Sequence, residues 1–188
     1  MYENIVRYRY VALLGLPGSG KDVAADIISR ELGFCQIRMS EVLSSYLSEL
    51  GVVPTRESLR EHGIRLRKEK GPQIIADLTY QRIIKEKAPG FVINGIRNIE
   101  EVDFFREKFG DDFISIAIYS PRKLRYLRLV QRNRSGFDRK DYRSFLRDDR
   151  VEVELFGLGN AIALADELIV NDGSIEDLKK SLLRILLI

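Results

Sequence analysis

GLPGSGK spans residues 15–21, between the apolar run YVALL and a segment of helical periodicity that starts near Val23. The heptapeptide has the form GxxxxGK, whose glycines let successive backbone N–H groups wrap a phosphate while the lysine reaches the outer phosphates. The helix that follows would point its positive N-terminal end at the same phosphates. A strand, a glycine loop and a helix in this order predict a P-loop for a nucleoside triphosphate, the alternative being a plain Gly/Pro turn.

We expect ATP with Mg²⁺ on this loop. Lys21 is the predicted catalytic cation, because it bridges donor oxygens during phosphoryl transfer. The predicted nucleotide-binding residues are Gly15, Leu16, Pro17, Gly18, Ser19, Gly20, Lys21, Asp22 and Val23.

The loop departs from the usual pattern at its next residue. Asp22 stands where a Ser or Thr hydroxyl normally binds Mg²⁺. An aspartate here can bind the ion directly, or it can occupy the first turn of a helix, where acidic residues are favoured. Both interpretations stay open, and Asp22 is a candidate metal ligand.

The rest of the chain alternates strand-like and helical segments. Apolar or β-branched runs bounded by turn residues predict five strands, and helical periodicity lies between them. Strands that are nearly continuous apolar runs are typical of an α/β fold with a parallel sheet covered by helices on both faces. The predicted strands are residues 10–14, 34–39, 91–94, 113–119 and 167–170. Helix starts are predicted at Ser40, at Thr55 with Ser58, and at Ser174 with Asp177.

Composition limits the possible chemistry. The 188 residues are 45% hydrophobic and 31% charged, as expected for one folded domain. With one cysteine, Cys35, and one histidine, His62, the chain has no set for a zinc cluster or a Ser/His/Asp triad. Without a signal-peptide pattern or an apolar run of about 18 residues, we expect a cytoplasmic protein away from membranes.

The positive charge is local. Residues 121–150 hold eleven Lys/Arg against four Asp, a net charge of +7, while the whole chain carries +3. This segment either closes over the transferring phosphates or forms a surface that binds a polyanion.

The sequence resembles the uncharacterised archaeal family of adenylate-kinase-related, dephospho-CoA-kinase-like P-loop proteins. The resemblance lies in GLPGSGKD, GIRLRKEKGPQIIADLT, FVINGIRNIEEVDFF and FGLGNAIALADELIVNDGSIEDL. It implies a P-loop nucleotide-kinase-like fold over residues 1–188 with strand order 2-3-1-4-5. It also implies a helical acceptor-binding insertion at residues 40–88 and a basic lid at residues 132–150.

Site residues follow from the same resemblance. FVINGIR resembles the third-strand motif of nucleoside monophosphate kinases, with Asn94 in place of an acidic metal-site residue and Arg97 as the arginine that holds the acceptor phosphate. Asn171 matches the turn that lines the nucleotide base, or belongs to an ordinary NDGS turn.

For the acceptor insertion, the resemblance makes Ser40, Arg60 and Arg65 substrate-binding candidates. Ser40 is equally a candidate helix cap, and the two arginines lie in a charged stretch that would also suit a solvated surface.

For the lid, the resemblance makes Arg128, Arg132 and Arg134 candidates, with Arg132 and Arg134 the predicted catalytic pair. Arg125, Arg128 and Arg132 also have the helical spacing of a solvated basic helix.

The sequence thus predicts a small-molecule kinase that transfers the terminal phosphoryl group of ATP to a nucleoside monophosphate-like acceptor. Dephospho-coenzyme A is a second acceptor. A different class also stays open, an NTP-dependent switch or RNA-associated NTPase with slow hydrolysis, because Asp22 and Asn94 both depart from the kinase pattern. The oligomeric state is left open.

Overall fold

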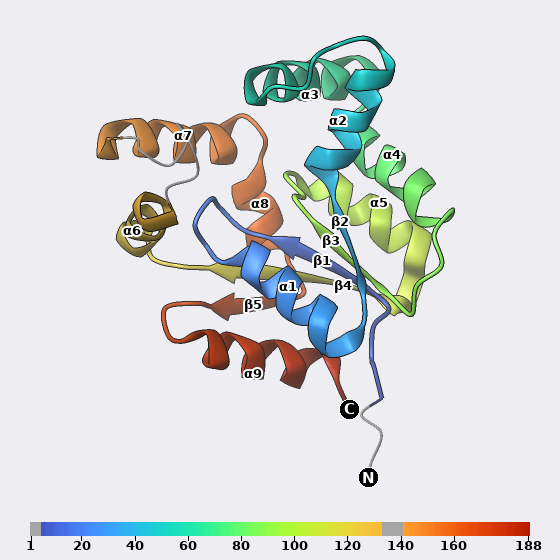
Figure 1. The fold of residues 1–188 in the computed structure, drawn as a ribbon, viewed down its shortest axis with the longest axis vertical. Coiled ribbons are helices and arrows are strands. Elements are labelled where there is room, and N and C mark those ends of the chain that lie inside the picture. Colours follow the sequence, from blue (N-terminus) through green and yellow to red (C-terminus); the bar gives the residue numbers. More distant parts are fainter. Residues whose placement is uncertain (1–4, 133–140) are drawn as a thin grey trace.

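In the computed structural model, which describes residues 5–132 and 141–188, five parallel strands form one sheet in the order β2-β3-β1-β4-β5 (Figure 1). The strands are β1 Tyr10–Leu14, β2 Cys35–Arg38, β3 Phe91–Asn94, β4 Phe113–Tyr119 and β5 Glu167–Val170. The predicted parallel α/β fold and its strand order are confirmed. Four strands have the predicted bounds, whereas β2 is one residue shorter at each end.

The helices alternate with the strands along the chain. They are α1 Lys21–Leu32, α2 Met39–Glu49, α3 Arg56–Lys70, α4 Ile74–Ile83, α5 Ile99–Phe109, α6 Arg122–Arg132, α7 Tyr142–Glu154, α8 Leu158–Ala163 and α9 Ile175–Leu186, with a 3-10 turn η1 at Gly110–Asp112. None of the helices in the described ranges is long and apolar enough to span a bilayer.

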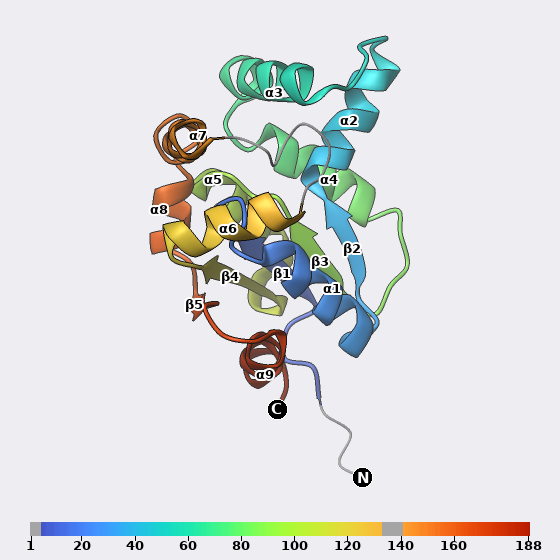
Figure 2. The ribbon, with the colours of Figure 1, turned by 60° about the vertical axis from the view of Figure 1, so that its left-hand side comes forward.

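Side-chain alternation along β1 divides the core into two layers. Val11 and Leu13 are fully buried against α1 and α9, together with Ile28 and Leu182. Ala12 and Leu14 face the other layer, where the fully buried Phe105 of α5 packs. Because both faces of the central strand are covered, its sequence is a continuous apolar run. Figures 1 and 2 show α1 and α9 on one side of the sheet and α5 and α8 on the other.

The helix caps show which of the predicted helix starts are correct. Thr55 and Ser58 form a reciprocal capping box at α3, and Ser174 and Asp177 form another at α9, as predicted. The predicted cap at Ser40 is wrong, because α2 begins at Met39, directly after β2, so that Ser40 is its second residue. The chain turns from strand to helix without a side-chain cap there.

Residues 39–90, which hold helices α2, α3 and α4, connect β2 to β3 and form the longest connection between strands of the sheet. In both ribbon views α3 and α7 lie near each other on the same side of the molecule (Figures 1 and 2). The P-loop follows β1 and Gly95 follows β3, so the carboxyl ends of neighbouring strands face these helices. This is the edge at which α/β sheets bind ligands.

Candidate active site

The P-loop backbone requires glycine at Gly15, Gly18 and Gly20, where φ is positive and another part of the chain approaches closely. Gly18 has φ 80°, and a Cβ there would lie 2.6 Å from the carbonyl oxygen of Arg125. Gly20 has φ 98°, and a Cβ there would overlap the side-chain amide of Asn171. The glycines are thus demanded by neighbours of the loop as well as by its curvature.

The ends of β4 and β5 brace the loop from behind. Asn171 Nδ2 donates to the Ser19 carbonyl oxygen at 2.8 Å, and Ser120 Oγ donates to the same oxygen at 3.0 Å. Arg128 donates in turn to the Asn171 carbonyl oxygen at 3.1 Å. Asn171 therefore lies next to the loop, and its side-chain N–H group is hydrogen-bonded to the loop backbone. Its predicted contact with a nucleotide base stays a prediction.

A buried ion pair adds a second brace. Arg125 of α6 donates to the Pro17 carbonyl oxygen at 3.0 Å and forms a two-armed pair with Asp149 of α7. The side chains of Arg125 and Asp149 are 4% and 5% exposed. Breaking such a pair leaves an uncompensated buried charge, so it anchors α6 and α7 to the loop. Arg125 and Arg128 are structural braces in this conformation, and the solvated-helix alternative does not describe them.

Lys21 and Asp22 begin α1 directly after the loop. Burial lowers the pKa of Lys21 below the ordinary value of a lysine, nearby guanidinium groups add to this, and the Asp22 carboxylate opposes it. Burial alone would raise the pKa of Asp22, but its cationic neighbours and the Asn94 amide hold it below the usual value of an aspartate. Asp22 is therefore ionised at neutral pH.

Asn94, at the end of β3, contacts Asp22, and both side chains line the cavity described below. Asn94 Nδ2 donates to Asp22 Oδ1 at 2.8 Å, while Asn94 Oδ1 is buried and has no hydrogen-bond partner among the described residues. A buried amide oxygen beside a carboxylate fits the oxygen ligands that Mg²⁺ prefers. Within the described ranges, no cluster of three or more His, Cys, Asp or Glu side chains could hold a metal alone. These two residues therefore suit an ion whose other ligands come from phosphates and water.

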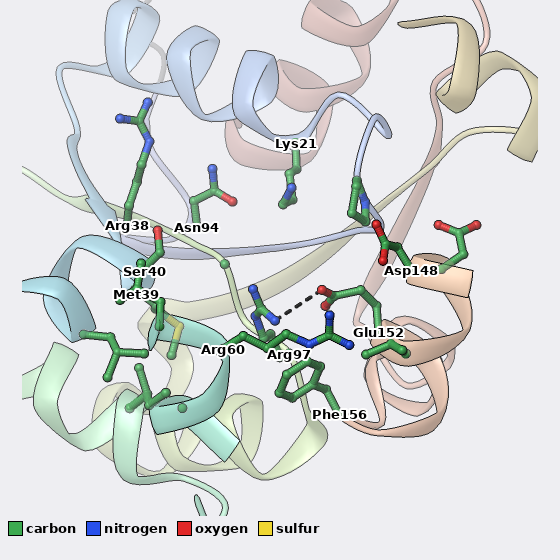
Figure 3. A pocket seen from close by; sticks show the side chains of 18 of the residues that line it. Lys21, Arg38, Met39, Ser40, Arg60, Asn94, Arg97, Asp148, Glu152 and Phe156 are labelled. Atoms are coloured by element: carbon green, nitrogen blue, oxygen red, sulfur yellow. Dashed lines mark hydrogen bonds and ion pairs between the residues drawn. The ribbon is translucent and has the colours of Figure 1, made fainter. Parts of the chain in front are cut away.

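A cavity of about 480 Å³ opens from the P-loop toward α3 and α7. Figure 3 shows Lys21, Arg97 and Glu152 converging on it from α1, from the loop after β3 and from α7. Its apolar lining comes from Pro17, Met39, Leu43, Leu59, Ile75, Leu129, Phe145, Val151 and Phe156. Its charged lining comes from Lys21, Asp22, Arg38, Arg60, Arg67, Arg97, Asp148, Asp149 and Glu152. The cavity is suited to a molecule that has both an anionic group and an apolar body.

A chain of ion pairs crosses the far side of this cavity. Arg67 of α3 contacts Glu101 of α5 at 2.5 Å, and Glu101 also accepts the Arg97 backbone N–H at 2.8 Å. The Arg97 guanidinium lies 3.2 Å from Glu152 of α7 and 4.7 Å from the centre of the Phe156 ring. Side chains from four separate segments are thereby linked.

The predicted acceptor residues divide between the cavity and the surface. Ser40, Arg60 and Arg97 line the cavity. Arg65 does not, because it lies exposed on α3, 3.9 Å from Glu69. Arg67, two residues later, lines the cavity instead.

The predicted lid residues lie only partly within the described ranges. Arg132, at the end of α6, has its guanidinium 3.5 Å from the Asp22 carboxylate, next to the P-loop. Arg134 lies outside the described residues. Leu16 lies in the loop and Val23 in the first turn of α1, and their predicted contact with a nucleotide stays a prediction.

Sequence reasoning missed Arg67, Glu101, Glu152 and Phe156. Two signals could have found part of this set. Arg60 and Arg67 are seven residues apart and so share a helix face, whereas Arg65 falls elsewhere. Asn98 followed by Glu101 has the spacing of an N-cap with an acidic third residue, and Asn98 indeed accepts the Glu101 N–H at 2.8 Å.

Comparison with known proteins identifies relatives over most of the chain. The family described as "AAA domain" matches residues 14–145. A UPF0200 protein of Staphylothermus marinus is 38% identical over 167 residues, covering 89% of this chain and 85% of that protein. A UPF0200 protein of Methanothermobacter thermautotrophicus is 36% identical over 176 residues, covering 94% of this chain and 88% of that one.

Solved structures share the fold at low sequence identity. A shikimate kinase from Acinetobacter baumannii, in complex with shikimate, is 16% identical, with a TM-score of 0.57 over 95% of this chain and 92% of that one. A gluconokinase from Sinorhizobium meliloti is 13% identical, with a TM-score of 0.60 over 96% of this chain and 92% of that one. These structures show a shared P-loop kinase-like fold.

Proposed function

Because the chain belongs to the UPF0200 family, which has archaeal members, and has a P-loop kinase-like fold, we propose that it is a kinase. It transfers the terminal phosphoryl group of ATP to a small phosphorylated acceptor, with a nucleoside monophosphate as the first candidate. The observation that carries this proposal is the cavity that joins the P-loop lysine to a set of arginines on the acceptor side.

The donor half of the proposal rests on the loop. Residues 15–23 bind the phosphates of ATP through backbone N–H groups, and Lys21 neutralises the outer phosphate oxygens. Arg132 lies close enough to Asp22 to approach the same phosphates. Its role, like that of Arg134, is to neutralise charge on the transferring group.

Asp22 and Asn94 would hold Mg²⁺, which would supply neutralising charge for the phosphates of ATP. The test is calorimetric: Asp22→Ala should weaken the Mg²⁺ dependence of ATP binding. If ATP binds the wild type equally well with Mg²⁺ and with EDTA, the two residues are not its ligands. Asp22→Ser restores the usual hydroxyl and separates metal binding from helix-terminal charge.

The acceptor half rests on the composition of the cavity wall. Among the residues that line it, the neutral polar side chains are Ser40, Asn94 and Tyr126, and the others are mostly apolar or charged. Polyhydroxylated acids need many neutral hydrogen-bonding partners, whereas a base or another planar body packs on apolar walls. Arginines suit a phosphate, which they can bind with two N–H groups. The wall therefore favours a nucleotide-like acceptor over the acceptors named for the two neighbouring kinases.

The experiment is an ATP-to-ADP assay over nucleoside monophosphates, deoxynucleotides, dephospho-coenzyme A, shikimate and gluconate. One monophosphate should raise ADP formation well above slow hydrolysis, and the phosphorylated acceptor should appear in equal amount. Lys21→Ala should lower that rate by about a thousandfold, since one preorganised charge at the transition state is lost. The kinase proposal fails if no acceptor raises turnover.

A binding assay separates the rival class. An RNA-associated NTPase would bind RNA with an affinity that falls steeply with salt, and the binding would persist in Lys21→Ala. The basic segment at residues 121–150 makes this test worthwhile, although Arg125 and Arg128 already use their charge inside the protein.

A further inference from the structure

The Glu152 carboxylate forms an ion pair with Arg97, the arginine that is expected to hold the acceptor phosphate. We propose that the Glu152 carboxylate competes with this phosphate for Arg97. An acceptor then binds well only if it carries an anionic group that displaces the carboxylate from Arg97. This inference rests on the proposed function, because it concerns the acceptor site of the same cavity.

Arg97 is positioned by contacts that do not involve Glu152. Its backbone N–H donates to Glu101 at 2.8 Å, and its guanidinium lies 4.7 Å from the centre of the Phe156 ring. Glu101 is fully buried, and Phe156 is 7% exposed. Arg97 can therefore exchange one anion for another without losing its place.

Comparison with the second ion pair on α7 shows that the Glu152 contact is of a different kind. Asp149 makes a buried, two-armed pair with Arg125 that is tied to the P-loop. Glu152 makes a single hydrogen bond of 3.2 Å with Arg97, and these side chains are 17% and 36% exposed. The buried pair anchors the helix, whereas the more exposed Arg97–Glu152 pair is replaceable.

The charges around Glu152 favour exchange for a phosphate. Arg60 and Arg67 line the same cavity, and Lys21 is close enough to interact electrostatically with both Arg97 and Glu152 (Figure 3). A phosphate monoester carries about −1.5 to −2 charges and three acceptor oxygens at neutral pH, whereas a carboxylate carries one charge. A phosphate can thus displace the carboxylate from Arg97, and an uncharged acceptor cannot.

The main experiment measures binding, and the turnover of wild type and Glu152→Gln is measured beside it. AMP, CMP, GMP and UMP are titrated by calorimetry into wild type, Glu152→Gln and Glu154→Gln, with the donor site filled by a non-hydrolysable ATP analogue. The four nucleosides serve as uncharged counterparts. Glu154 is the matched control, because it lies on the same helix, exposed, 3.5 Å from Arg150, and does not line the cavity.

We expect Glu152→Gln to bind the preferred monophosphate about three- to tenfold more tightly than wild type, since a competing ion pair and a repelling charge are both removed. Glu154→Gln should match wild type, and nucleoside binding should not change. A thermal melt of each variant verifies folding, and the isosteric glutamine keeps the shape of Glu152.

Three results overturn the inference. Equal or weaker monophosphate binding by Glu152→Gln does so, and so does the absence of monophosphate binding in both forms. A third is a kcat that falls at least a hundredfold with unchanged KM, which would make Glu152 a proton acceptor for a hydroxyl substrate instead. Tighter binding without turnover would leave this inference standing while the kinase proposal fails, so the two failures are distinguishable.

Discussion

The two sides of the cavity are held by different kinds of contact. On the donor side, the backbone of residues 15–20 is fixed by glycine conformations and by buried donors from the ends of β4 and β5. On the acceptor side, one ion pair joins α3 to α5 and another joins α7 to the loop after β3. A backbone cradle is in place before its ligand arrives, whereas an ion pair can exchange a partner for the ligand. We therefore expect mutations on one side to leave binding on the other largely intact.

The largest effect on stability is expected from Glu101→Ala on the acceptor side. The carboxylate is fully buried and pairs with Arg67, whose side chain is 12% exposed. Its removal leaves a largely buried guanidinium without its partner and should lower the free energy of unfolding by about 3 kcal/mol. Chemical denaturation measures this loss, and calorimetry should show ATP binding close to that of wild type.

Glu100→Ala is the matched control for Glu101→Ala. Glu100 occupies the same first turn of α5 but is exposed, so its loss should cost little. Equal destabilisation by the two variants would mean that the Arg67–Glu101 pair does not hold the acceptor side together.

A smaller loss is expected from Gly20→Ala on the donor side. The new Cβ would take a strained positive φ and overlap the Asn171 amide, at a cost of about 1–3 kcal/mol. ATP affinity should fall, because Asn171 must release the Ser19 carbonyl and the loop must shift. Monophosphate binding on the acceptor side should stay within twofold of wild type, by calorimetry.

Gly157→Ala separates backbone strain from the overlap. Gly157, like Gly20, is a left-handed residue just before a helix, with φ 76°, but a Cβ there meets nothing within 4 Å. It should lose less stability than Gly20→Ala and keep its ATP affinity. A Gly20→Ala protein with normal ATP affinity would contradict the rigid donor side.

The same contrast explains what the sequence could predict. The donor side consists of consecutive residues, so GLPGSGK and its flanking strand and helix were enough to locate it. Strand positions also followed from local apolar runs. Arg67 pairs with Glu101 and Arg97 with Glu152, in each case between segments far apart in the chain, and nothing in the local sequence indicates either pair. Asp149 shows the same difficulty, because it looks like an ordinary surface acid in a charged run yet is buried against Arg125.

The start of α2 was mispredicted for a related reason. Ser40 before Glu41 has the local pattern of a cap, but β2 ends at Arg38 and the chain enters the helix at Met39, whose side chain is 2% exposed. Burial of Met39 in the core decides where the helix begins. Tertiary packing thus overrides a weak local preference.

The smallest effect at neutral pH, and one that tests the donor side alone, is the pH dependence of ATP affinity. The folded-state pKa of Lys21 is lowered, mainly by burial, so its ammonium loses its proton at a lower pH than an ordinary lysine does. ATP favours the protonated form, so affinity should be constant below this pKa and fall above it, by at most about tenfold per pH unit. Calorimetry from pH 7 to pH 10 should show the fall in wild type. Lys21→Arg keeps its charge throughout this range and should show a flatter profile, even if its affinity is lower. If the two profiles run parallel, Lys21 does not supply the charge that binds the phosphates, and the donor side would rest on backbone N–H groups alone.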